Sequence, residues 1–223
     1  LQAGLDAAVS TEEKLALIRQ WDAARRKLDT WSSLVYVRFS QDTRNEVTKA
    51  DRDYADALLP ELTECSVNLK KQLLADTDRP ALEAHLGRHV FDLWQFDVDA
   101  FEPIIKTDLE QEAKLTAPYT ELCASAEIPF DGKTHNLSSL RAYLDDADRE
   151  KRHRANQLYW GFFERHREQL DTLFDQLVQL RHNMAQKLGF DTYTPLGYRQ
   201  MQRLDYDEKD VASYREQVVN DIV

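Results

Sequence analysis

Two histidines four residues apart are the nearest approach to a metal site in this sequence. His85 and His89 enclose residues 86–88, and this spacing puts two imidazoles on one face of a helix, as a zinc pair requires. However, Gly87 weakens a helix, Arg88 places a positive charge beside the cation, and no Glu follows His85 to act as a base. We therefore expect two surface or half-buried histidines and no metal site.

Guanidinium and phenol side chains gather near the end of the chain, at Tyr198, Arg199, Arg203 and Tyr206. Such groups, close together, bind carboxylates or the peptide backbone. They also form structural ion-pair clusters, and the residue types alone favour that interpretation. We carry these four forward as the candidate substrate-binding residues, with both interpretations open.

Other catalytic patterns are absent from the sequence. It contains no His-Glu-x-x-His, no glycine-rich phosphate loop, no Gly-x-Ser-x-Gly and no Cys-x-x-Cys. His166 falls on a predicted apolar stripe, which favours a hydrogen-bonded histidine at the core edge over a catalytic base. The acidic cluster Asp145, Asp146 and Asp148 is typical of a helix start, where carboxylates favour the positive end of the dipole. We expect no catalytic residue and no metal ligand within this chain.

The composition excludes several classes of partner. Forty acidic against 29 basic side chains give a net charge of −11, which disfavours nucleic acid and anionic membranes as partners. No apolar run approaches the roughly 18 residues that span a bilayer. The two cysteines, Cys65 and Cys123, are too few for a disulfide framework or a zinc cage. Reduced thiols in a cytoplasmic protein are expected.

The sequence contains only six Gly and six Pro, and this scarcity of helix-breaking residues predicts long helices. The expected fold is all-α, an elongated multi-helix assembly with one small β-hairpin, divided into domains 1–125 and 126–223. Ser10 and Glu13 resemble a capping box. A helix over residues 45–74 contains Pro60, which kinks it or splits it in two. The longest helix is predicted from 145–148 to Leu188.

The hairpin is predicted near residues 127–137. Asp131-Gly132 is a strong two-residue turn signal, because both residues tolerate the positive φ of a type I′ turn. Ile128 and Phe130 are expected to lean on the following helix, since two strands alone are marginal in water. Ser138 or Ser139 is the expected cap of a short helix after the hairpin.

An apolar face is predicted on the last helix, which begins near Asp207 and reaches Val223. Val211, Tyr214, Val218 and Ile222 lie near one side of it. The chain stops there without Gly, Pro or a polar tail, which we interpret as truncation. We expect the face to pair with another copy of the chain or to be poorly ordered. In the alternative, the helix folds back and buries all four side chains.

Four stretches together resemble the oligoendopeptidase F family, relatives of thimet oligopeptidase. They include Ala-Glu-Ile-Pro-Phe-Asp-Gly-Lys-Thr and the segment from Lys-Leu-Gly-Phe to Arg-Leu-Asp-Tyr, and the order and spacing of the four together are specific. The stretches lie at residues 38–43, 126–134, 148–163 and 187–206. The resemblance spans nearly the whole chain, more closely after residue 100 than before it. None of these stretches is a catalytic signature.

The resemblance implies the N-terminal, channel-wall part of a helical zinc peptidase that hydrolyses short peptides. In that family, zinc is held by the histidines of His-Glu-x-x-His and a later Glu, and none of these matches a residue here. The full-length parent would therefore bind zinc, and this segment alone would be inactive. The alternative is a free-standing helical domain that binds peptides or proteins without catalysis.

Overall fold

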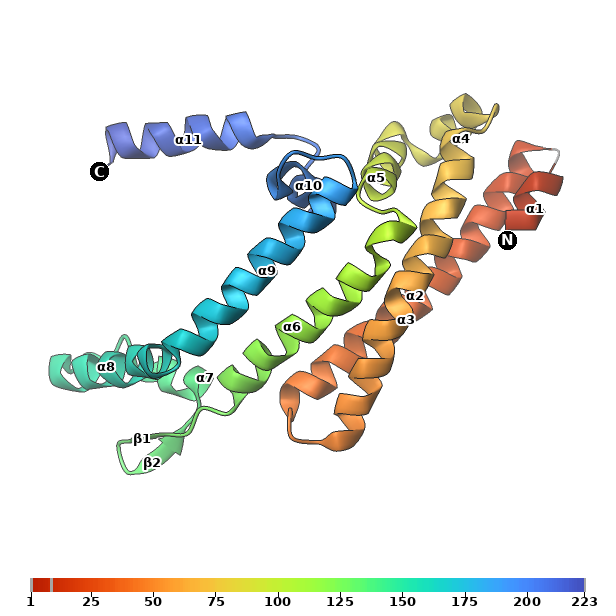
Figure 1. Cartoon of the computed structure of the whole chain (residues 1–223). Helices are drawn as coiled ribbons and strands as arrows, with labels where there is room; N and C mark the ends of the chain where they lie inside the picture. Colours follow the sequence, from red (N-terminus) through yellow and green to blue (C-terminus); the bar gives the residue numbers. More distant parts are fainter. Residues whose placement is uncertain (1, 9, 223) are drawn as a thin grey trace. The chain divides into compact units, whose positions relative to one another are not determined.

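The computed structural model describes residues 2–8 and 10–222 and consists of helices apart from one hairpin (Figure 1). The expected all-α fold with one small hairpin is confirmed. The α-helices are α1 (Gln2–Ala7), α2 (Thr11–Gln41), α3 (Glu46–Leu74), α4 (Arg79–Leu86), α5 (Arg88–Asp99), α6 (Lys106–Ala124), α7 (Leu137–Leu140), α8 (Arg149–Arg165), α9 (Arg167–Lys187), α10 (Tyr193–Gln200) and α11 (Glu208–Asp221). The strands are β1 (Ile128–Phe130) and β2 (Lys133–His135), and the 3-10 turns are η1 (Pro103–Ile105) and η2 (Arg141–Tyr143).

The chain forms two compact units. Unit 1 contains Leu1–Trp31, Ala57–Leu109 and Arg181–Val223, and unit 2 contains Ser32–Asp56 and Glu110–Leu180. These units group residues by contact, so the division at residue 125 expected from the sequence stays a prediction. No helix among the described residues is long and apolar enough to cross a membrane.

Unit 1 is held together by two clusters of buried apolar side chains. One joins the first part of α2 to the last part of α3 and to α4 and α5, through Leu15, Ile18, Leu73, Leu82 and Phe91 among others. The other joins α3, η1, α9 and α10 through Val67, Phe101, Ile105, Met184 and Leu196. Full burial of a side chain such as Phe91 contributes about 2 kcal/mol.

Local signals in the sequence set several helix ends. Ser10 Oγ accepts the Glu13 N–H at 3.2 Å and Glu13 Oε2 accepts the Ser10 N–H at 3.2 Å, so the predicted capping box is present. Pro60 lies inside α3, which continues through it as one helix and is not split. The aromatic segment after Gly87, difficult to assign from the sequence, is helix α5, and Gly87 separates it from α4 with φ 87°.

The hairpin has the predicted turn. Asp131 and Gly132 have φ of 51° and 75°, and Ile128 pairs with His135 in antiparallel register. In unit 2, buried Ile128 and Phe130 pack with Leu140 and with Phe162 of α8. Lys151 Nζ lies 2.9 Å from Asp131 Oδ2, and this contact lowers the pKa of the Asp131 carboxyl.

Two details after the hairpin correct the sequence analysis. Asn136, rather than Ser138 or Ser139, caps α7, and Ser139 completes its capping box from the N3 position. The predicted single helix up to Leu188 is two helices, because the backbone leaves the helical region at His166, with φ −106° and ψ 15°. His166 therefore ends α8 instead of lying within a stripe. Asp148 does cap α8, accepting the N–H groups of Glu150 and Lys151.

The last helix begins as predicted but does not bury its apolar side. Asp207 caps α11 in a capping box with Asp210. Tyr214 and Ile222 are 66% and 78% exposed, and Val211 and Val218 are only half-buried. The described residues therefore do not cover the face, and the alternative in which the helix folds back and buries all four side chains is wrong. Self-association through this face stays a prediction, and Val223 lies outside the described residues.

Substitution of Gly132 tests the turn. Gly132→Val should lower the free energy of unfolding by about 1 kcal/mol or more, because a β-branched residue resists positive φ. No atom lies within 4 Å of the added Cβ, so the cost is backbone strain alone. Gly161→Ala in α8 is the matched control in the same unit. Its added Cβ would meet only Arg165 Nη1, at 3.5 Å. Because Ala favours helix over Gly, this substitution should raise the free energy of unfolding by up to about 1 kcal/mol.

Urea unfolding followed by circular dichroism measures both free energies. Equal effects of the two substitutions would contradict the assignment of a positive-φ turn at Gly132.

Candidate functional site

The structure brings three of the four predicted substrate-binding residues together. Tyr198 lies in α10, and Arg203 and Tyr206 lie in the connection from α10 to α11. The Arg203 N–H donates to the Tyr198 carbonyl at 3.0 Å. The rings of Tyr198 and Tyr206 meet edge to face, with centroids 6.1 Å apart, and the Arg203 guanidinium lies 5.7 Å from the Tyr206 ring. Arg203 and Tyr206 are exposed, and Tyr198 is half-buried.

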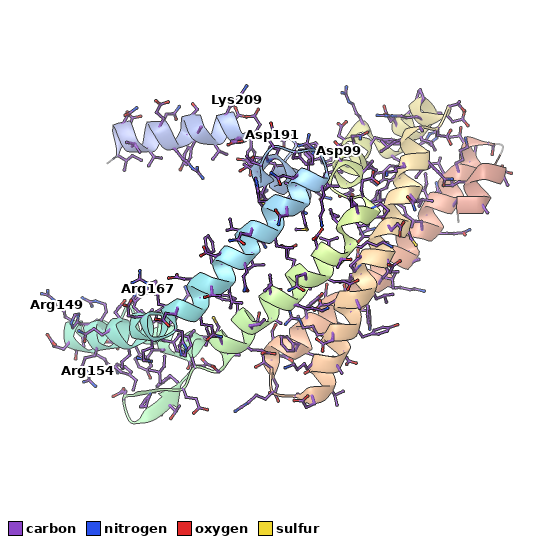
Figure 2. All side chains as sticks on the ribbon, viewed as in Figure 1. Asp99, Arg149, Arg154, Arg167, Asp191 and Lys209 are labelled. Atoms are coloured by element: carbon purple, nitrogen blue, oxygen red, sulfur yellow. The ribbon has the colours of Figure 1, made fainter. Side chains whose placement is uncertain are left out.

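Arg199 points into a different environment. Its Nη1 donates to the Pro195 carbonyl at 3.0 Å, and its Nε lies 3.5 Å from Asp99 Oδ2. Its guanidinium lies 4.8 Å from the Phe190 ring and 5.6 Å from the Phe96 ring. Asp99 is the last residue of α5, and it lies beside α10 (Figure 2). Arg199 therefore attaches α10 to the end of α5.

The turn after α10 is fixed by a second contact to the same end of α5. Gln202 adopts φ 55°, a left-handed conformation that is uncommon for a residue other than glycine. Its side-chain amide donates to Asp97 Oδ1 at 3.1 Å. The other oxygen of Asp97 accepts from Lys70 Nζ at 2.7 Å. Lys70 is 9% exposed, and its ammonium lies 5.6 Å from the Trp21 ring.

Charge explains why these contacts occur at this place. Asp97 and Asp99 occupy the last turn of α5, where the helix dipole is negative and carboxylates are unfavourable. Lys70 from α3 neutralises Asp97, and Arg199 from α10 neutralises Asp99. A buried ammonium is costly without a partner. The Lys70–Asp97 pair and its Gln202 contact, which we call the Asp97 network, therefore join α3, α5 and the turn after α10.

Sequence reasoning missed the Asp97 network. Lys70, Asp97 and Gln202 are far apart in the chain, and each residue alone has an ordinary surface interpretation. The one available signal was the pair of carboxylates in the last turn of a helix, which indicates that cations must lie nearby.

Two adjoining grooves of unit 1 meet at this network. One has a volume of about 690 Å³ and is lined by apolar residues of α2 and α3 together with Phe101 and Gln200. The other has a volume of about 600 Å³ and is lined by α2 and α5 together with Gln202. Four residues line both grooves, namely Trp21, Arg25, Lys70 and Asp97. Gln200 and Gln202, which precede Arg203 in the chain, thus lie at the edges of these two grooves.

The chemistry available here is binding. Arg203 offers guanidinium donors and Tyr206 offers a phenol and an aromatic face, which suit a carboxylate or a peptide carbonyl. The cluster of Tyr198, Arg203 and Tyr206 does not contain a nucleophile hydrogen-bonded to a general base. The side chains are therefore suited to hold a ligand rather than to transform it.

The two histidines with metal-like spacing do not form a pair in the structure. His85 and His89 lie in different helices, α4 and α5, so they do not share one helix face as their spacing suggested. His85 Nδ1 lies 2.8 Å from the Ala81 carbonyl within α4. Over residues 2–8 and 10–222, no group of three or more His, Cys, Asp or Glu could hold a metal ion.

Comparison with known families finds one that matches the first part of the chain. The family described as the Peptidase M3 N-terminal domain matches residues 1–101. Among proteins with curated functions, none matches. These residues are the part of the chain in which the sequence motifs of oligoendopeptidase F are least evident.

Three solved structures are similar over nearly the whole chain. One, assigned as an oligoendopeptidase F from Bacillus anthracis str. Ames, has 33% identity and a TM-score of 0.92 over 98% of this chain. PZ peptidase A, solved with an inhibitor, has 33% identity and a TM-score of 0.91 over 97%. A further protein assigned as oligoendopeptidase F has 32% identity and a TM-score of 0.93 over 99%. The chain spans 38–40% of the length of these proteins.

Loss of Asp97 should destabilise unit 1. Asp97→Ala leaves the Lys70 ammonium buried without its partner, and we expect a loss of about 2–3 kcal/mol in unfolding free energy. Arg26→Ala, at an exposed ion pair of α2 with a side chain 75% exposed, is the control and should cost about 0.5 kcal/mol or less. Chemical denaturation of the two variants measures the difference. Equal losses would show that the Asp97 network does not hold unit 1 together.

Proposed function

The chain belongs to the oligoendopeptidase F family of M3 peptidases, and we propose that it forms the channel wall of a zinc-dependent oligoendopeptidase. In this role it limits the substrates to short peptides and contacts them. Hydrolysis requires a longer protein that contains this chain. The solved relatives are more than twice as long as this chain. A cytoplasmic location, expected from the cysteines, stays a prediction.

One observation supports the proposal above all others. The fold of 97–99% of the chain matches proteins of this family at 32–33% identity. One of those proteins is a peptidase with an inhibitor bound. Similarity that continues through both compact units favours a role within a peptidase of the same architecture.

We assign different roles to the four candidate residues. Arg203 and Tyr206 are exposed and form the surface that contacts the peptide, and Tyr198 supports the Tyr206 ring. Arg199 is a positioning residue, since its guanidinium contacts Asp99 and two aromatic rings of unit 1. Gln202 and Asp97 fix the turn that carries Arg203.

The metal belongs to another part of the proposed enzyme. The donors in the described residues do not fit a zinc ion, as His85 and His89 show. We therefore propose that zinc is bound by residues outside this chain, and that the chain contributes peptide contacts alone.

The first prediction of this proposal is that the chain alone does not hydrolyse peptides. Purified chain, mixed with quenched fluorescent oligopeptides and zinc, should release no more fluorescence than buffer, because its sequence has no His-Glu-x-x-His and its described residues form no group of three metal donors. The protein that carries this chain should hydrolyse the same peptides and stop on addition of a chelator. Chelator-sensitive turnover by the chain alone would overturn the proposal, and absence of turnover in both would favour a binding domain without catalysis.

The second prediction concerns Arg203. In the protein that carries this chain, Arg203→Ala should lower kcat/KM for short peptides about tenfold, because a charged hydrogen bond to the substrate is lost. The change should appear in KM, with kcat little altered, since Arg203 does not touch the reacting bond. Arg215→Ala, which removes an exposed arginine of α11, is the matched control. Unchanged kinetics in Arg203→Ala would remove this residue from the site.

A further inference from the structure

The groove between α2 and α5, which we call the α2–α5 groove, is positively charged although the chain as a whole is acidic. The residues that line it include four cations and two carboxylates, a net charge of +2, whereas the whole chain carries −11. Arg19 and Arg26 both line it from α2. They lie seven residues apart, so they project from nearly the same line along the helix, with a rise of about 10 Å between them.

The ion pairs on the α2 side of this groove leave one arginine without a partner. Asp22 accepts from Arg26 Nε at 2.7 Å and from Arg25 Nη2 at 2.8 Å, and Arg25 also donates to Asp29. Among the described residues, no carboxylate lies within ion-pair distance of Arg19. Arg19 is therefore free to pair with an incoming carboxylate, and Arg26 keeps further N–H donors for the same purpose.

The opposite side of the groove is apolar. Leu86 of α4 and Val90 and Leu93 of α5 line it and are half-buried. Trp21 and Trp94 also line the groove, and their rings meet edge to face with centroids 5.8 Å apart. Because Leu86, Val90 and Trp21 pack on the buried cluster of unit 1, this surface is already ordered and loses little entropy on binding.

Helix α11 carries an apolar face of the same length. Val211, Tyr214, Val218 and Ile222, which we call the α11 face, fall within about 80° of one another around the helix, and the described residues leave them uncovered. Val211 and Val218 are seven residues apart and rise by about 10 Å, as the two arginines of α2 do. Two turns of α11 thus match the two turns of α2 that line the groove.

One edge of the α11 face is acidic. Asp210 and Asp221 lie within about 20° of each other around the helix, next to Tyr214. The whole of α11 contains four carboxylates and two cations, a net charge of −2. An apolar face with an acidic edge complements a groove that has one apolar and one basic side, which is how an amphipathic helix binds in a groove.

We propose that α11 of a second copy of the chain binds in the α2–α5 groove. In this contact the α11 face packs on Leu86, Val90 and Leu93, and its acidic edge lies along Arg19 and Arg26. The contact is head to tail, because a helix of one copy meets a groove of the other. It does not depend on the assignment of peptidase function, since both surfaces belong to unit 1.

The charges favour this contact over two alternatives. Direct pairing of two α11 faces would bring together two helices that each carry a charge of −2, and like charges at an interface are unfavourable. Nucleic acid would find positive charge on one side of the groove alone, and its phosphates gain nothing from the apolar side. An acidic amphipathic helix satisfies both sides.

Sedimentation velocity of the full chain measures the association. Over about 1 to 100 µM, a range in which a micromolar contact is observed, the sedimentation coefficient should rise reversibly with concentration. The association should weaken as salt rises through about 0.15 M, where exposed charges are screened.

Substitutions in α11 test the apolar face. The variant Tyr214→Asp, Val218→Asp should weaken self-association at least about tenfold, because two carboxylates would meet the apolar side of the groove. The variant Ser213→Asp, Asn220→Asp makes the matched control. Both of its positions are exposed and lie on the other side of α11, so it should change the association less than about threefold.

Substitutions in α2 test the groove. The variant Arg19→Glu, Arg26→Glu should also weaken self-association at least about tenfold, because its carboxylates would face the acidic edge of α11. The variant Lys27→Glu, Arg38→Glu makes the same charge change at exposed positions of α2 that do not line the groove. This control should leave most of the association intact.

A mixture of the two weakened variants identifies the contact. The α11 variant keeps an intact groove, and the α2 variant keeps an intact α11, so an equimolar mixture should regain association that neither variant shows alone. Misfolded variants would not restore each other, and pairing of two α11 faces would not be restored either.

Three results would overturn the proposal. They are a full chain that stays monomeric over the whole concentration range, a mixture that associates no more than its components do, and controls that weaken the association as strongly as the variants they match. Loss of hydrolysis in the protein that carries this chain would not bear on the proposal, since association is measured directly.

Discussion

The neutralisation of two carboxylates at the end of α5 is the constraint on which the proposed site depends. Asp97 and Asp99 lie at the negative end of a helix dipole, and each requires a cation. Lys70 comes from α3 and Arg199 from α10, so satisfying the charges joins three helices. Gln202 then uses the remaining oxygen of Asp97, which determines the course of the chain up to Arg203. The contacts of Asp97 and Asp99 therefore both stabilise unit 1 and position the candidate site.

Local sequence predicted the features that depend on local chemistry. Asp131-Gly132 specified its turn because few residue pairs tolerate two positive φ values in succession. Ser10 with Glu13, and Asp207 at α11, specified helix starts because their side chains satisfy free backbone N–H groups. The break at His166 was not predicted, since the apolar spacing continues across it while the backbone does not.

The site was harder to predict because its parts are distant in the chain. The residue types at Tyr198, Arg203 and Tyr206 indicated binding chemistry, and the structure places them together. Nothing in the sequence around Arg199 distinguished it from Arg203, although one contacts Asp99 and the other is exposed. That difference is a tertiary property. It follows from where α5 ends, which depends on the packing of Phe91 and Trp94 in unit 1.

We propose that the Asp97 network places residues 198–206 to contact a peptide. The most direct measurement is photo-crosslinking of a short peptide to the protein that carries this chain, with the adducts located by mass spectrometry, in the natural sequence and in Asp97→Asn. We expect adducts within residues 198–206 and a loss of most of them in Asp97→Asn, with the chain still folded. Adducts located only outside this segment, or an equal yield in the two proteins, would contradict it.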